Sequence, residues 1–73
     1  MVQDTIPPDV LADYQAAVQA HYKAGAFNTP CAARLAMLRR LKESLGEGWC
    51  RLNARDLQEL WAREERLAQW GTA

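Results

Sequence analysis

Apolar residues along this chain recur at the three- and four-residue spacing of an amphipathic helix in three stretches, which predicts three helices. The first is expected over about residues 8–24, between a proline that suits a first helical turn and Gly25, a common residue after a helix end. Its apolar arc contains Val10, Leu11, Tyr14, Ala17, Val18, His21 and Tyr22.

The second helix is expected over residues 30–45. Thr29 offers a capping hydroxyl before Pro30, Gly46 follows the last apolar position, and residues 26–28 are expected to form the preceding turn. Its apolar arc contains Cys31, Leu35, Met37, Leu38, Leu41 and Leu45.

The third helix is expected over about residues 54–70, with Asn53 as its cap and Gly71 after its end. Its apolar arc contains Leu57, Leu60, Trp61, Leu67 and Ala68. We expect residues 46–48 to be flexible and residues 49–52 to form a short extended or single-turn connection.

These stretches predict one all-α domain over residues 1–73, a compact three-helix bundle with short connections. The 73 residues include one isoleucine and three valines, and no run alternates apolar and polar positions. A β-sheet is therefore not expected.

The formal net charge is zero, but the charges are unevenly distributed. Residues 1–22 carry three acids and neither lysine nor arginine, whereas residues 23–42 carry five bases and no acid. A neutral chain is unsuited to binding that relies on phosphate neutralisation, so nucleic acid is expected only as a secondary contact. The basic stretch is either a solvated helix face or a surface that attracts an acidic partner.

Reactive side chains are too scattered to predict a catalytic or metal site. Cys31, Cys50 and the single histidine, His21, form no CxxC or HxxH pair, and no phosphate-binding or dinucleotide motif is present. A first-turn position would activate the Cys31 thiol, but no second catalytic group accompanies it. We therefore expect a non-enzymatic protein that uses neither a cofactor nor a metal. The sequence has no signal-like start and no apolar segment long enough to span a membrane, and this favours a cytoplasmic location.

Two charged residues, Arg34 and Glu64, interrupt the apolar arcs of the second and third helices. They either form an ion pair or leave Glu64 exposed at a contact surface. Trp61 is expected in the core, whereas Trp49 is assigned to neither core nor surface. Trp70 lies off its apolar arc near arginines, a composition typical of binding hot spots, and either contacts a partner or packs onto the domain.

A DNA-reading helix-turn-helix is disfavoured, because residues 46–53 are too long for its turn and the third helix is rich in acids. In size, helical richness, neutral charge and lack of catalytic groups, the chain resembles the small phage-encoded host-takeover regulators that bind bacterial RNA polymerase. The resemblance implies inhibition of transcription, or antitermination, by occupancy of a large host complex in the bacterial cytoplasm.

The resemblance assigns no residue. From the basic stretch and the tryptophan, the expected partner contacts are Arg39, Arg40, Lys42, Arg51 and Trp70. The expected state is a monomer or weak homodimer. Alternatives are an anti-CRISPR-type inhibitor of another host complex and a self-associating virion or assembly protein.

Overall fold

The structure, a computed structural model, describes residues 2–25 and 31–72, and every regular element within them is a helix. The helices are α1 (Val2–Thr5), α2 (Pro8–Lys23), α3 (Ala33–Leu45), α4 (Glu47–Leu52) and α5 (Ala54–Thr72). The prediction of an all-α protein is confirmed for these residues. The three long helices were expected, whereas α1 was not, and the single-turn alternative for residues 49–52 anticipated only part of α4.

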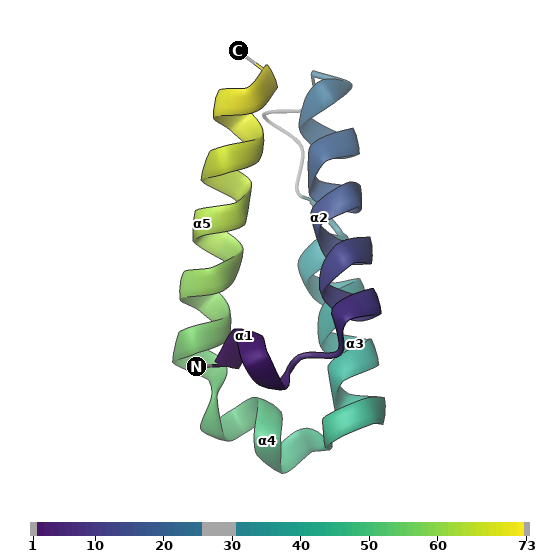
Figure 1. The fold of residues 1–73 in the computed structure, drawn as a ribbon, viewed down its shortest axis with the longest axis vertical. Coiled ribbons are helices and arrows are strands. Elements are labelled where there is room, and N and C mark those ends of the chain that lie inside the picture. Colours follow the sequence, from purple (N-terminus) through teal and green to yellow (C-terminus); the bar gives the residue numbers. More distant parts are fainter. Residues whose placement is uncertain (1, 26–30, 73) are drawn as a thin grey trace.

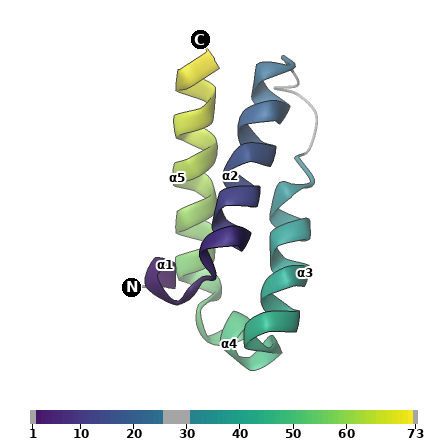
Figure 2. The same cartoon turned by 45° about the vertical axis from the view of Figure 1, so that its right-hand side comes forward.

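The three long helices lie side by side, with α2 and α5 running in one direction and α3 in the other (Figure 1). α2 packs against both α5 and α3, and α4 connects α3 to α5 across one end of the molecule (Figure 2). α1 lies at that same end, where it packs against α5. Across the described ranges, no helix has the length and apolarity needed to cross a membrane.

The core is built from one stripe on each long helix, at the three- and four-residue spacing that places side chains on one face. α2 contributes Val10, Tyr14, Val18 and Tyr22, α3 contributes Ala33, Met37 and Leu41, and α5 contributes Leu57, Leu60, Trp61 and Ala68, with Ile6 and Cys50 closing one end. The predicted core position of Trp61 is confirmed, and Trp49 packs partly buried against the core.

Two leucines assigned to apolar arcs lie at the surface instead. The α3 stripe is centred on Met37, and Leu35 lies two residues before it, about 200° around the helix. Leu35 is accordingly 54% exposed, and Leu67 on α5 is 60% exposed. Ala17 of α2 is also exposed, although it was assigned to the arc.

The predicted helix boundaries need three corrections. Cys31 and Ala32 precede α3, so the thiol is not in a first helical turn, and the predicted turn at 26–28 and start at 29–30 lie outside the described residues. Residues 47–52 form α4, where a flexible stretch and a short connection were expected. α5 begins at Ala54, directly after Asn53, as predicted, although the Asn53 side chain donates to the Trp49 carbonyl oxygen over 2.9 Å, back toward α4. α5 continues through residue 71.

The predicted end of the first helix is accurate to one residue. α2 ends at Lys23, and Gly25 follows with a φ of +81°, a conformation that residues with a side chain rarely adopt.

Candidate protein-binding surface

Of the three bases of α3 that were predicted as partner contacts, one pairs with another helix of the protein and two are exposed. Arg40 points toward α2, where it forms ion pairs with Asp13 and, over 3.0 Å, with Asp9. The acidic first segment and the basic middle segment therefore neutralise each other in part across the α2–α3 contact. Arg39 and Lys42 lie on the exposed side of α3 with Leu35, and within residues 2–25 and 31–72 neither base forms an ion pair.

Arg34 does pair with α5, but with the neighbour of the predicted residue. Its Nε donates to Glu65 Oε2 over 2.8 Å, and its guanidinium carbon lies 5.7 Å from the centre of the Trp61 ring. The hydrogen bond to Glu65 raises the pKa of Arg34, which keeps this cation charged. Glu64 faces α2 instead and accepts a hydrogen bond from Gln15 Nε2 over 3.3 Å. Arg34 and Glu64, the two charged residues that interrupt the apolar arcs, thus both have partners. The partner of Arg34 lies on α5, whereas that of Glu64 lies on α2.

Arg51 lies far from the other predicted contacts. It belongs to α4 and pairs with Glu47 one turn earlier, over 3.4 Å, on the exposed side of that short helix. α4 occupies one end of the molecule and the C-terminal end of α5 occupies the other (Figure 1). Arg51 and Trp70 therefore cannot contribute to one small contact patch.

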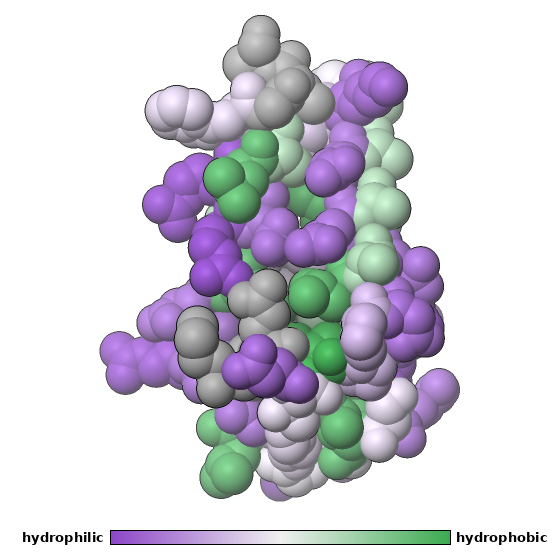
Figure 3. Space-filling model, viewed as in Figure 1, coloured by the Kyte–Doolittle hydropathy of each residue, from purple (hydrophilic) through white to green (hydrophobic). Residues whose placement is uncertain are grey.

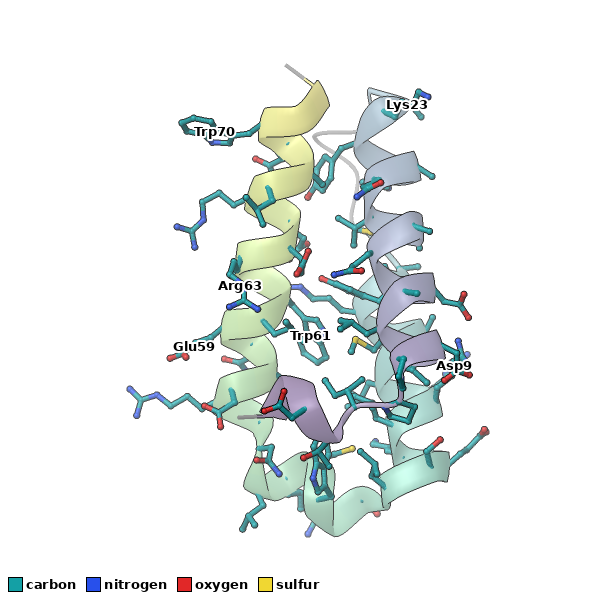
Figure 4. The ribbon with its side chains drawn as sticks, in the orientation of Figure 1. Asp9, Lys23, Glu59, Trp61, Arg63 and Trp70 are labelled. Carbon is teal, nitrogen blue, oxygen red and sulfur yellow. The ribbon has the colours of Figure 1, made fainter. Side chains whose placement is uncertain are left out.

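Trp70 is 80% exposed and lies one turn from the exposed Leu67 on α5. Figure 4 shows its indole projecting from the outer side of α5, on the side from which Arg63 and Glu59 also project. Positions 63, 67 and 70 follow the i, i+4, i+7 spacing of one helix stripe, so arginine, leucine and tryptophan adjoin. Exposed side chains of this kind fit an interaction surface better than a folded-back end.

Beside this stripe, α2 and α5 enclose a groove of about 680 Å³ between their C-terminal halves. α2 and α5 line it with Gln15, Val18, Gln19, Lys23, Glu64, Leu67 and Ala68. In Figure 3, green apolar surface lies over this part of α5 and within the seam between α5 and α2, with purple polar surface on both sides. Leu67 is shared by the groove and the exposed stripe, which makes them one continuous surface.

Sequence reasoning named Trp70 as a candidate contact but not Leu67 or the groove. The helical wheel placed Leu67 in the apolar arc, and the spacing of residues 63, 67 and 70 is the signal that could have separated it from the core. Gln15, Gln19 and Lys23 carry no such signal, because their place in the groove depends on how α2 packs against α5.

The side chains considered for chemistry are dispersed. His21 packs edge to face against Tyr22, with ring centres 5.0 Å apart, and the thiols of Cys31 and Cys50 are not joined. In the part of the chain that the structure describes, no three side chains of histidine, cysteine, aspartate or glutamate come together as metal ligands. Comparisons of the chain with protein-family models, curated proteins and solved structures give no match.

Proposed function

We propose that this protein is a non-enzymatic regulator that acts by binding another protein through α5. The observation that carries the proposal is the neighbouring exposure of Leu67 and Trp70. A tryptophan side chain buries about 150–250 Å² when covered, so leaving one exposed forgoes a large favourable contribution to stability. Tryptophan beside arginine is the composition enriched among residues that dominate binding energy.

For the partner we propose bacterial RNA polymerase, bound in the manner of the small phage regulators. This part is supported by the resemblance in chain length, helical richness and neutral charge. A chain of this size would act by occupancy, because a ligand that binds one state of a large complex more tightly shifts the population toward that state.

A pull-down from bacterial lysate tests the partner and the surface together. The tagged wild-type protein should retain polymerase subunits after salt washing, and Trp70→Ala should lower their affinity by at least about tenfold, as expected for a hot-spot residue. Leu52→Ala is the matched control, because Leu52 is 88% exposed but lies on α4. A third variant, Arg39→Glu with Lys42→Glu, tests the α3 surface and leaves the Arg40 ion pairs intact.

Each result has a distinct meaning. Equal retention by wild type and Trp70→Ala would show that Trp70 is not a contact. Recovery of another complex would contradict the polymerase proposal. It is the result expected if the protein is an anti-CRISPR-type inhibitor. Recovery of the bait alone would favour a self-associating assembly protein if the molecular mass of the purified protein in solution also rises with its concentration.

A further inference from the structure

A row of exposed side chains follows the side of α5 that faces away from the core. Within α5 it consists of residues 56, 59, 63, 66 and 70, whose alternating spacing of three and four keeps them on one side of a helix. Figure 4 shows Glu59, Arg63 and Trp70 projecting from this outer side. Leu52, two residues before α5 begins, is 88% exposed and adds an apolar side chain at the N-terminal end. We call these six residues the outer row.

The chemistry of the outer row changes along its length. Its two ends are apolar, its acids occupy the half nearer the start of α5, and its bases occupy the other half. The members also form three pairs in which both residues are equally far from residue 61: Leu52 with Trp70, Asp56 with Arg66, and Glu59 with Arg63. Each pair therefore combines either two apolar side chains or an acid and a base.

This symmetry makes the outer row complementary to itself. If two copies of α5 pack antiparallel about a two-fold axis at residue 61, each residue meets the one equally far from residue 61 in the second copy. Glu59 then meets Arg63 of the second copy, and the axis repeats every contact. A parallel dimer in register would instead place each charge against its own copy, which is unfavourable. The charges therefore favour the antiparallel arrangement.

One further base of α5 opposes this pairing. Arg55 is exposed beside Asp56 on the flank of the outer row, where it would lie near Arg66 of the second copy. This repulsion is set against the attraction of the two kinds of acid–base pair, each of which occurs twice in the dimer. The balance of charge across the contact is therefore attractive.

The other charges of α5 do not disturb the outer row. Glu64 and Glu65 lie toward the bundle, where Gln15 of α2 and Arg34 of α3 donate hydrogen bonds to them. Arg63 already interacts within its own chain. Because a guanidinium group has five N–H donors, an exposed arginine can also pair with a carboxylate of a second copy.

We propose that the outer row binds a second copy of this chain in an antiparallel, two-fold symmetric dimer. Most of the affinity comes from the apolar ends, because a covered tryptophan buries about 150–250 Å² whereas exposed ion pairs contribute little. The ion pairs set the direction and register. One face of a helix is small beside the roughly 1,200–2,000 Å² of a stable interface, so we expect a dissociation constant of about 10–100 μM.

The dimer goes beyond the proposed function and competes with it, because both cover Trp70. The partner proposed above would bind the monomer. Leu52→Ser should therefore weaken the dimer and leave partner retention in the pull-down intact, whereas Trp70→Ser should weaken both.

Charge reversal tests the pairing directly. In one variant, Asp56→Arg with Glu59→Arg makes the charged part of the outer row wholly basic. In the other, Arg63→Glu with Arg66→Glu makes it wholly acidic. In sedimentation equilibrium at low salt, between about 1 μM and 1 mM, each variant should dimerise at least about tenfold more weakly than wild type. An equimolar mixture of the two should form a heterodimer at least about tenfold tighter than either homodimer.

Single substitutions locate the contact. Trp70→Ser should weaken the dimer by about tenfold or more. Leu35→Ser should leave it unchanged, because Leu35 is exposed but lies on α3. Arg55→Gln should strengthen it, because a repulsive charge is removed. Circular dichroism of each variant checks that the helices are retained.

Several outcomes would overturn the proposal. A wild-type protein that stays monomeric up to about 1 mM would refute the dimer. A dimer that neither reversal weakens, or that mixing the two variants does not restore, would place the contact elsewhere. A mass beyond that of a dimer would contradict a closed two-fold arrangement.

The dimer and the proposed function fail separately. If the pull-down retains a partner through Trp70 and the purified protein is monomeric, the dimer proposal fails and the proposed function stands. Dimerisation through the outer row without any retained partner would mean the reverse.

Discussion

Tyr14 places a phenolic hydroxyl inside the apolar core. The hydroxyl donates a hydrogen bond to the backbone oxygen of Trp61 over 3.3 Å, which links α2 to α5. Burial raises the pKa of Tyr14 above its ordinary value of 10.0, and the nearby charge of Glu65 adds to the rise. The cause is physical: a phenolate in this position would lose its hydration and face a carboxylate.

This shift predicts how stability changes at alkaline pH. Because the folded protein holds the Tyr14 proton more tightly than the unfolded chain, the contribution is fully present below about pH 10 and is lost as pH rises toward the folded pKa. The free energy of unfolding should fall by up to about 1.4 kcal/mol per pH unit in that range.

The variant Tyr14→Phe should be less stable by about 1 kcal/mol at neutral pH, because the hydrogen bond to Trp61 is lost. It should also lose the alkaline dependence that the tyrosine confers. Urea unfolding of both proteins between about pH 8 and pH 11 measures the two effects. Parallel pH profiles for the two proteins would contradict the assignment to Tyr14.

At the scale of elements, the junction between α3 and α4 depends on one backbone conformation. Gly46 separates the two helices with φ and ψ of 93° and 157°, and the chain re-enters a helix at Glu47. Residues with a Cβ atom rarely adopt this conformation. The second glycine of the stretch, Gly48, lies within α4, has no positive φ, and has open space where a Cβ atom would be.

The two glycines should therefore respond in opposite directions to the same change. Gly46→Ala should destabilise the protein by about 1–3 kcal/mol. No atom obstructs the added methyl group, but alanine is strained at the positive φ of this position. Gly48→Ala should stabilise it by up to about 1 kcal/mol, since alanine favours the helix and restricts the unfolded chain. Thermal and urea unfolding measure both, and equal effects would refute the interpretation.

At the scale of the whole molecule, the protein depends on a small core. A chain of 73 residues buries a modest fraction of its surface, and one core of this size supplies a net stability of only about 3–5 kcal/mol. Leu41 of α3 is completely buried. Because the core is small, the free energy lost by truncating one large buried side chain is comparable to the entire free energy of unfolding.

Leu41→Ala should cost about 3 kcal/mol and leave a substantial fraction of the chain unfolded at 37 °C. Leu35→Ala, on the exposed side of the same helix, should change stability by less than about 0.5 kcal/mol. Circular dichroism at 222 nm and chemical denaturation distinguish the two variants. A fully folded Leu41→Ala protein with unchanged stability would show that the core is larger than these contacts indicate.

The helices and their inward faces could largely be predicted from the sequence. Residues such as Tyr14, Met37 and Trp61 recur at helical spacing, and that periodicity is a local property of the chain. The short α1 and α4 could not be predicted in this way, because helices of four and six residues are too short to show a period. Packing against α5 and α3 stabilises them where local propensity would not.

What the sequence by itself determined was therefore the three long helices and most of the positions that form their apolar sides. The tertiary structure decided which neighbour lies on each flank of those apolar sides. Glu64 and Glu65 are one residue apart, about 100° around α5, so one meets Gln15 of α2 and the other meets Arg34 of α3. The candidate surface arises in the same way. Periodicity places Leu67 in the apolar arc of its helix, but the packing of α2 beside α5 leaves its side chain exposed at an open groove.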